Sequence, residues 1–261
     1  MSKSTSPCDL GGLSVLVTRP AHQADHLCEL IEQAHGRPVR FPAMEIRGPA
    51  DKHAARAQLK SARHAQLLVF VSANAVQYAF PLLPDQLPFD IGIAAVGKAT
   101  ARALNEVGLE PTLVPERMDS EGLLALPAFQ QVSGKHVIVL RGNGGRELLS
   151  ESLLERGARV DQVEVYRRVL PQRVAAAANL VSNWPRLVQV VTASSRMILD
   201  NLFMLLGDEG TERIRQTPLV VISQRMAEYA VERGCEQVYV SASASDEEVL
   251  ATLCEVNEDV A

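Results

Sequence analysis

Small polar and cationic residues follow six apolar segments of the chain, and these residue types are suited to binding an anion. They are Thr18 and Arg19, Ser72 and Asn74, Gly97, Arg141 and Gly142, Ser194 and Ser195, and Ser223. Hydroxyl groups, guanidinium groups and the free backbone N–H groups at the start of a helix all bind carboxylates or phosphates. Serine, glycine and asparagine are equally common in turns and helix caps, which explains any one position. The agreement of all six positions favours an anion-binding site.

The familiar nucleotide, metal and hydrolase motifs are missing from the sequence. The segment RGNGGRE at residues 141–147 has Glu147 where GxGxxG needs its third glycine, and there is no GxxxxGK[ST] loop. His22 and His26 lie four residues apart without a third ligand at zinc-type spacing. There is no GxSxG elbow. We therefore expect neither a cofactor nor a metal, and any catalysis would work mainly by holding a reactive substrate in one geometry.

Tyr166 is the one side chain that we keep as a candidate for chemistry. Its phenol lies in an extended segment, residues 160–169, which is expected to connect two domains. Packing of this amphipathic side chain against the segment explains the residue equally well from the sequence alone.

The elements that position these residues are strands alternating with helices. Apolar runs at residues 13–17, 67–71, 91–96, 136–140, 188–193 and 219–222 each lead through a polar junction into an amphipathic helix. This alternation predicts an α/β fold with doubly wound parallel sheets, covered by helices on both faces. Such sheets bind ligands beyond the carboxyl ends of their strands, where the polar junctions lie. Residues 37–46 and 160–169 alternate apolar and polar side chains instead, and are expected to be extended connectors.

The second half of the chain repeats the first. With a shift of 126 residues, Gly108 meets Gly234, Val114 meets Val240 and Ser120 meets Asp246. The opening unit also recurs, with Arg19 matching Arg141. We call the units that begin at residues 13 and 136 a, those that begin at 67 and 188 b, and those that begin at 91 and 219 c. Their order a, b, c, a, b, c indicates two domains of similar fold.

The composition is that of an ordered protein with a polar surface. The 261 residues are enough for two domains, and the chain is 47% hydrophobic and 22% charged. A net charge of −5 and an aromatic content of 4% argue against a nucleic-acid partner. The N-terminal segment has no apolar core of a signal peptide, and no run approaches the ~20 apolar residues of a membrane span. We expect a cytoplasmic protein with no membrane partner, whose Cys8, Cys28, Cys235 and Cys254 are reduced thiols.

Six segments together resemble the uroporphyrinogen-III synthase family, and the similarity covers nearly the whole chain. They are LVTRP at 16–20, VFVSANAV at 69–76, AVGKAT at 95–100, LRG at 140–142, VEVYRR at 163–168 and VVTASS at 190–195. Their order and spacing carry the resemblance. One departure is Ala193, aligned with Ser72 at a place where relatives commonly carry serine, which leaves Ser194 and Ser195 as the hydroxyls there.

The resemblance implies two α/β domains joined by a two-stranded antiparallel linker. One domain would combine residues 1–37 with 171–261, the linker strands would be residues 38–46 and 162–170, and the other domain would be residues 47–161. The first a unit would then belong with the second b and c units. Periodicity alone does not predict that exchange.

The substrate that the resemblance implies is hydroxymethylbilane, a linear tetrapyrrole with eight carboxylates, which would close to uroporphyrinogen III with ring D inverted and water lost. Tyr166 would assist departure of the hydroxyl. The carboxylates would be bound by Thr18, Arg19, Ser72, Asn74, Gly97, Thr100, Arg141, Gly142, Ser194, Ser195 and Ser223. We expect a monomer that receives its substrate from the upstream deaminase. The alternative is a two-lobed module that binds a small polyanion without chemistry, and its ligand would be recovered unchanged.

Overall fold

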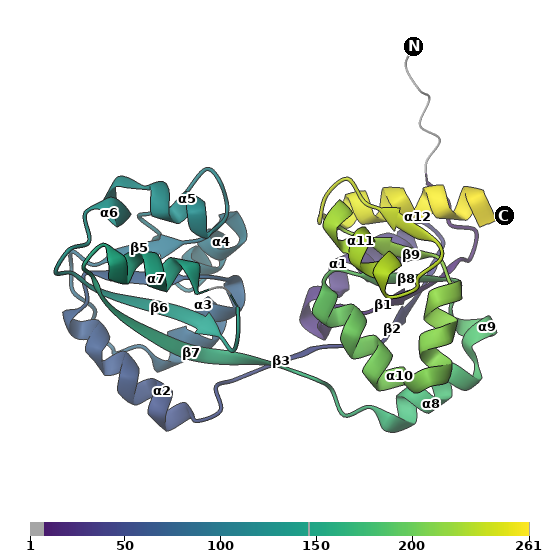
Figure 1. Cartoon of the computed structure of the whole chain (residues 1–261), viewed down its shortest axis with the longest axis horizontal. Helices are drawn as coiled ribbons and strands as arrows, with labels where there is room; N and C mark the ends of the chain where they lie inside the picture. Colours follow the sequence, from purple (N-terminus) through teal and green to yellow (C-terminus); the bar gives the residue numbers. More distant parts are fainter. Residues whose placement is uncertain (1–7, 146, 261) are drawn as a thin grey trace, which may run out of the picture. The chain divides into compact units, whose positions relative to one another are not determined.

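The computed structural model describes residues 8–145 and 147–260, without the side chain of residue 260 (Figure 1). The chain divides into two compact units. Unit 1 contains the described residues up to Glu45 and those from Val169 onward, and unit 2 is Ile46–Arg168. The chain thus passes between the units twice, at residues 45–46 and 168–169.

Unit 1 is built on a five-stranded sheet in which neighbouring strands run parallel. In spatial order its strands are β10 (Val238–Val240), β9 (Leu219–Val221), β8 (Val190–Ala193), β1 (Ser14–Val17) and β2 (Arg37–Arg40). Its helices are the 3₁₀ turn η1 (Ala21–Gln23), α1 (Asp25–Gln33), α8 (Val174–Ser182), α9 (Trp184–Leu187), α10 (Arg196–Gln216), α11 (Gln224–Glu232) and α12 (Asp246–Val260). The helix α10 is interrupted at Gly207, where φ is +65°.

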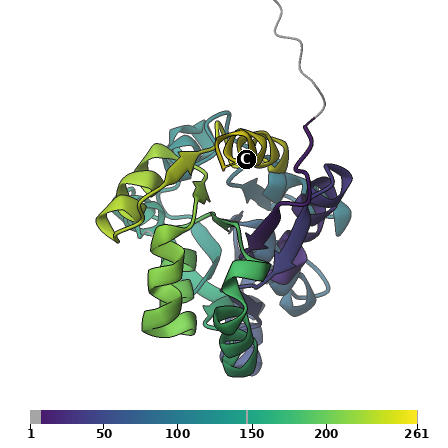
Figure 2. The same cartoon turned by 90° about the vertical axis from the view of Figure 1, so that its right-hand side faces the viewer.

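Helices cover both faces of this sheet because its strands are apolar on both sides. Val15 and Val17 of β1 and Val190 of β8 pack in one cluster with the buried faces of α1 and α12. The intervening Leu16 and Val191 are also buried, and alternation along a strand turns them to the other face. There α10 packs on β8 and contacts α8 and α11 (Figure 2).

Unit 2 contains a second five-stranded sheet. In spatial order its strands are β3 (Glu45–Arg47), β7 (Arg159–Val169), β6 (His136–Gly142), β4 (Leu67–Phe70) and β5 (Gly92–Ala95). The four strands from β7 to β5 run parallel, and Leu113 adds a single parallel bridge to Ala94 of β5. Its helices are α2 (Lys52–Leu59), η2 (Lys60–His64), α3 (Ala73–Ala79), η3 (Phe80–Leu82), α4 (Lys98–Glu106), α5 (Ser120–Ala125), α6 (Pro127–Gln130) and α7 (Leu148–Glu155).

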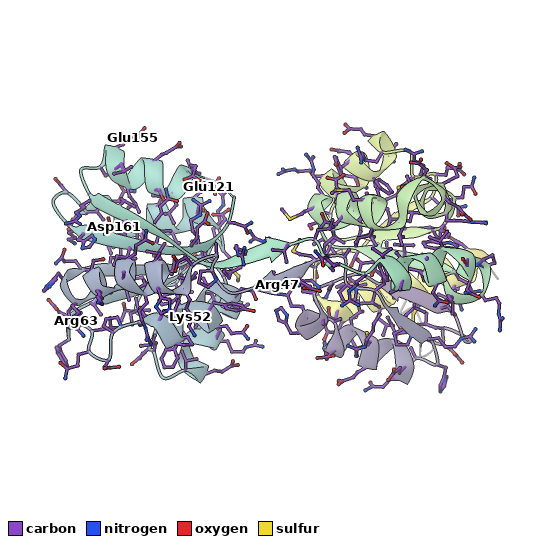
Figure 3. All side chains as sticks on the ribbon, turned by 90° about the horizontal axis from the view of Figure 1, so that it is seen from below. Arg47, Lys52, Arg63, Glu121, Glu155 and Asp161 are labelled. Atoms are coloured by element: carbon purple, nitrogen blue, oxygen red, sulfur yellow. A yellow bond between two sulfur atoms is a disulfide. The ribbon has the colours of Figure 1, made fainter. Side chains whose placement is uncertain are left out.

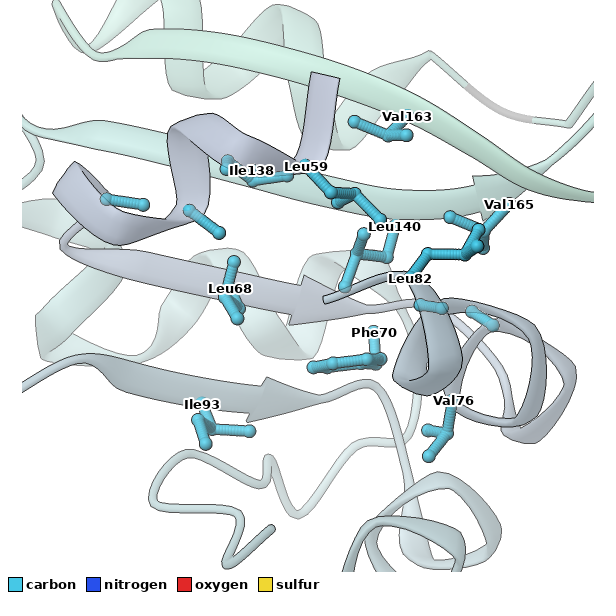
Figure 4. Close-up of a cluster of buried hydrophobic side chains, with 14 of the residues drawn as sticks. Leu59, Leu68, Phe70, Val76, Leu82, Ile93, Ile138, Leu140, Val163 and Val165 are labelled. Atoms are coloured by element: carbon cyan, nitrogen blue, oxygen red, sulfur yellow. The ribbon is translucent and has the colours of Figure 1, made fainter. Parts of the chain in front are cut away.

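The strands of unit 2 also divide their side chains between two cores. Leu68, Phe70 and Ile138 face a cluster completed by α2, α3 and α4 (Figure 4). Their neighbours Val69 and Val137 face a separate cluster formed with α5, α6 and α7. Charged side chains such as Arg63 and Glu155 lie exposed on the outer surface of the unit (Figure 3). The α/β fold with parallel sheets predicted from the sequence is confirmed.

In both sheets the strand of the a unit lies beside the strand of the b unit from the other half of the sequence. In unit 1, β1 of the first a unit lies between β2 and β8. In unit 2, β6 of the second a unit lies between β7 and β4. Hydrogen bonding therefore joins the first a unit to the second b and c units, and the second a unit to the first b and c units.

The segments expected to act as connectors are largely strands of the two sheets. Arg37–Arg40 forms β2, an edge strand parallel to β1. Arg159–Val169 forms the eleven-residue strand β7, parallel to β6. Alternating polarity in these segments reflects positions near a sheet edge, where one side of a strand is partly exposed. Residues 38–46 and 162–170 are thus not linker alone, since most of them complete the sheets.

The expectation of four reduced cysteines is wrong for one pair. Cys8 and Cys254 form a disulfide with their Cα atoms 5.9 Å apart, although 246 residues separate them in sequence. Cys254 lies on α12, which packs along α1, so tertiary packing brings it to the start of the described chain. Cys28 and Cys235 are free and buried. In the part of the chain that the structure describes, no helix is both long and apolar enough to cross a membrane.

Candidate functional site

Serine hydroxyls cap three of the helices that follow parallel strands. The Oγ atoms of Ser72, Ser195 and Ser223 accept hydrogen bonds from the backbone N–H three residues later, at 3.1, 3.2 and 3.3 Å. The polar junctions after these strands are therefore helix caps, as their residue types indicate.

The positions of these caps show that the alignment of Ala193 with Ser72 is wrong. Ala193 is the last residue of β8 and is buried. Ser195 follows the end of β8 by two residues, as Ser72 follows the end of β4. The structural counterpart of Ser72 is therefore Ser195, and a capping hydroxyl is present in both units. Ser194 lies between strand and cap and is half-buried.

The remaining predicted positions at the start of helices differ in what they offer a ligand. Gly97 precedes α4 with extended backbone and has no side chain to donate. Thr100 is 3% exposed within the first turn of the same helix. Asn74 is half-buried in the first turn of α3.

Thr18 and Arg19, predicted as anion-binding residues of unit 1, both have partners within the protein. The Thr18 hydroxyl is buried and donates to the backbone oxygen of Thr192 at 2.5 Å, which ties the ends of β1 and β8 together. Arg19 forms an ion pair with Asp246 at the start of α12, and its side chain is 13% exposed. His26 lies on the same carboxylate, with Nδ1 3.0 Å from Asp246 Oδ2. A ligand anion at Arg19 would therefore compete with Asp246.

Tyr166 is positioned by an irregularity in β7. Arg141 pairs with Glu164, but the next residue of β6, Gly142, pairs with Tyr166, so that β7 contains one extra residue. A bulge of this kind changes which side of the sheet the following side chains face. Val165 and Tyr166 accordingly lie in the same core cluster although they are consecutive.

The phenol of Tyr166 receives two hydrogen bonds. The Ser72 hydroxyl donates to its oxygen at 3.2 Å and Arg168 Nη2 donates at 2.9 Å. The guanidinium carbon of Arg168 lies 5.3 Å from the centre of the Tyr166 ring, and the Tyr78 ring stacks on it with centroids 6.3 Å apart. The side chain is 0% exposed. A Cβ on Gly142 would come within 2.5 Å of the ring, so the close approach requires glycine.

Arg168 and Asn143 are residues of this cluster that the sequence did not reveal. The Asn143 side chain accepts from the backbone N–H of Arg168 at 2.7 Å and donates to its backbone oxygen at 3.3 Å. Arg168 Nη1 also donates to the backbone oxygen of Asn143 at 3.3 Å. The motif VEVYRR contains Arg168, but its role depends on the bulge, which no local pattern predicts.

Arg141 is buried and already paired with a carboxylate. Its Nη1 donates to Glu147 Oε1 at 2.8 Å and also to Gln162, while Nη2 donates to the backbone oxygen of Gly144 at 2.7 Å. Hydrogen bonds from Gln162 and Arg141 hold the pKa of Glu147 below its usual value. Glu147 therefore stays ionised, and the Arg141 site is one that accepts a carboxylate.

A cavity of about 190 Å³ lies beside Arg141 and Tyr166 at the carboxyl end of β6. Residues from β6, β7, the loop after β6, α5 and α7 line it, all of them in unit 2. Ser120 and Ser150 contribute hydroxyls that the sequence analysis did not select.

The predicted residues thus form two groups, each at the carboxyl edge of its own sheet. Thr18, Arg19, Ser194, Ser195 and Ser223 belong to unit 1, and Ser72, Asn74, Gly97, Thr100, Arg141, Gly142 and Tyr166 belong to unit 2. Among the described residues, no group of three or more histidine, cysteine or acidic side chains is arranged to hold a metal ion.

Two α/β units with serine-capped helices at the carboxyl edges of their sheets define a two-domain α/β protein. A family model described as uroporphyrinogen-III synthase HemD matches residues 25–251. The chain belongs to the uroporphyrinogen-III synthase family. It is 32% identical to uroporphyrinogen-III synthase of Escherichia coli (strain K12), over 92% of this chain and 100% of that protein. The enzyme of Salmonella typhimurium is 30% identical over the same shares of the two chains.

Solved structures support the fold. A crystal structure of a mutant uroporphyrinogen III synthase from the extremely thermophilic bacterium Thermus thermophilus matches with a TM-score of 0.64 and 20% identity, covering 95% of this chain and 100% of that one. The uroporphyrinogen-III synthetase of Helicobacter pylori 26695 matches with a TM-score of 0.60 and 17% identity over the same shares.

Proposed function

We propose that this chain closes hydroxymethylbilane to uroporphyrinogen III, with Tyr166 assisting departure of the substrate's hydroxyl group. The ring A hydroxymethyl group loses water to give an electrophilic azafulvene. The substituted carbon of ring D attacks it to give a spiro intermediate, which fragments and recloses with ring D inverted. Because unguided closure gives the type I isomer, the protein acts mainly by favouring one attack geometry.

The position of the Tyr166 phenol is the observation that carries the proposal. In a member of this family, a phenol held at the carboxyl edge of a sheet, beside a cavity, can donate its proton to a hydroxyl that leaves as water. The Ser72 hydroxyl at 3.2 Å and the Arg168 guanidinium at 2.9 Å donate to the phenol oxygen, so both would stabilise the negative charge that develops on it. Donors fixed before the reaction stabilise such charge without reorganising.

Access to the phenol depends on Arg168. Tyr166 is shielded from solvent, and the half-buried Arg168 lies over its ring. A carboxylate of the substrate would attract this guanidinium away from the ring while keeping it near the phenol oxygen. The proposal therefore assigns Arg168 a positioning role for both Tyr166 and the substrate.

The other predicted residues would bind the carboxylates of the substrate. Backbone N–H groups and side chains at the sheet edges of both units would contribute, from Thr18, Arg19, Ser72, Asn74, Gly97, Thr100, Arg141, Gly142, Ser194, Ser195 and Ser223. Binding at Arg19 and Arg141 would be an exchange, because Asp246 and Glu147 now occupy them.

The product isomer tests the function. Hydroxymethylbilane generated in situ by its deaminase is incubated with the protein, and the oxidised porphyrins are separated by chromatography. Type III product that depends on the protein supports the proposal. Type I product alone, from folded protein, would contradict it and favour the alternative of a polyanion-binding module without chemistry.

The substitution Tyr166→Phe tests the role of the phenol. We expect turnover to fall severalfold or more, since general acids contribute about 10²–10⁴-fold, with the fold intact. Tyr78→Phe is the matched control, because it removes a phenol that donates to the backbone oxygen of Ile46 at 2.9 Å and keeps the ring stacked on Tyr166. An unchanged rate in Tyr166→Phe would remove its chemical role.

The proposal includes a cytoplasmic monomer that works beside the upstream deaminase. We expect the deaminase to act nearby because its product closes to the wrong isomer without the synthase and must therefore reach the synthase soon after its release. Light scattering and co-sedimentation with the deaminase test these two points. A stable dimer would contradict the first.

A further inference from the structure

The cavity at the carboxyl end of β6 is lined by polar groups that could bind a carboxylate. Its volume of about 190 Å³ corresponds to roughly six water molecules at ~30 Å³ each. That space accommodates the few heavy atoms of an acetate or propionate arm.

Ser150 is the first of these groups. It lies in the first turn of α7, borders the cavity and is 2% exposed. Within the described residues its hydroxyl has no hydrogen-bond partner, whereas the buried hydroxyls of Thr18 and Thr192 each donate to a backbone oxygen. The hydroxyl at the cavity wall is therefore available to donate a hydrogen bond to a ligand.

Arg141 is the second group. Its side chain is 9% exposed, while that of its partner Glu147 is 50% exposed. The cation is thus buried and the carboxylate is half exposed, so a ligand carboxylate can replace Glu147 while Glu147 turns to solvent. The endogenous pair already shows which chemistry the guanidinium accepts.

Two glycines of the loop after β6 lie near this guanidinium. Gly144 and Gly145 adopt φ of +65° and +109°, a region that disfavours other residues. A Cβ at Gly145 would come within 3.4 Å of Arg141 Nη2. Gly145 therefore places no side chain against this guanidinium.

We propose that this cavity is a subsite for one carboxylate arm of the tetrapyrrole, in which the arm displaces Glu147 from Arg141 and accepts a hydrogen bond from Ser150. This assignment rests on the proposed function. Ser120 also lines the cavity.

Ser150→Ala is the direct test, with Ser152→Ala as the control on the same helix but outside the cavity. With hydroxymethylbilane we expect Ser150→Ala to raise KM severalfold, with kcat within about twofold and the type III share unchanged. Its melting temperature should not fall, because the lost hydroxyl has no partner. Glu147→Gln should lower KM, since an internal competitor is weakened. Wild-type KM in Ser150→Ala, or a raised KM in Glu147→Gln, would overturn the subsite.

A binding measurement separates this proposal from the function on which it rests. Sodium propionate is titrated into the ¹⁵N-labelled full chain, and amide shifts are followed by NMR. Saturable shifts at Gly144, Gly145 and Ser150 that disappear in Ser150→Ala support the subsite even if the wild type yields only type I product. Type III production together with an absence of these shifts would overturn the subsite and leave the function standing.

Discussion

Replacing Gly142 by alanine tests whether the backbone of β6 fixes the position of the Tyr166 ring. The added Cβ would lie 2.5 Å from both Cε2 and Cζ of that ring, whereas carbon atoms pack best at about 3.5–4.0 Å. The ring would have to move by about 1 Å, yet it is fully buried and stacked on Tyr78. Overpacking of this kind destabilises a protein by about 1–3 kcal/mol.

The expected effects on melting and turnover follow from that displacement. For a unit of about 120 residues, each kcal/mol lowers the melting temperature by roughly 3–5 °C, so Gly142→Ala should melt about 3–15 °C lower. A shift of about 1 Å also lengthens the contact of the phenol with Ser72, and misplacement on that scale reduces turnover by as much as about 10²-fold.

The assay compares Gly142→Ala with Gly48→Ala by differential scanning calorimetry and by the rate of type III product. Gly48 is a suitable control because the nearest atoms to its added Cβ are 3.9 Å away, in ordinary contact. Wild-type melting and turnover in Gly142→Ala would refute the reasoning, because they would show that the Tyr166 ring can move to accommodate the added Cβ.

Two further results are expected from groups whose ionisation or oxidation the structure defines. Burial raises the pKa of Cys235 to about 11 and raises that of Cys28, so native protein purified without reductant should show no thiol that reacts rapidly with Ellman's reagent at pH 8. Two thiols should appear on unfolding, whereas two fast thiols in the native state would mean that Cys8 and Cys254 are reduced. The lowered pKa of Glu147 gives stability that is present above the usual glutamate pKa and is lost as the pH falls through the lowered value. The melting difference between wild type and Glu147→Gln should therefore shrink in acid, and a difference independent of pH would exclude an ionised pair.

Local patterns were sufficient to predict the elements and the helix caps. Ser72 and Ser223 each follow a buried strand and precede an amphipathic helix, and both prove to be caps. Such signals act over a few residues, so the chain itself contains them. The alignment of Ala193 with Ser72 was wrong because sequence alignment does not show where a strand ends. The pairing of β8 shows that the strand ends at Ala193, so that Ser195 is the counterpart of Ser72.

Features that depend on distant partners were not predictable. The ion pair of Arg19 with Asp246 joins residues 227 positions apart, and the disulfide of Cys8 with Cys254 spans 246. The bulge that turns Tyr166 into the core is visible only in the pairing of β7 with β6. Ser150 was not predicted either. A serine in a helix has no distinctive sequence pattern, and the cavity beside it forms only in the folded protein.

The exchange of repeat units between the two sheets imposes an order on folding during synthesis. Unit 2 is one continuous stretch, Ile46–Arg168, and every strand pairing of β4, β5 and β6 is available once that stretch has left the ribosome. The strand β1 must wait for β8, and Val15 pairs with Val190. At about 5–20 residues per second, that interval lasts roughly 10–35 s. Unit 2 can complete its sheet before β8 is synthesised, so the apolar strand β1 remains unpaired on one side while the middle of the chain folds.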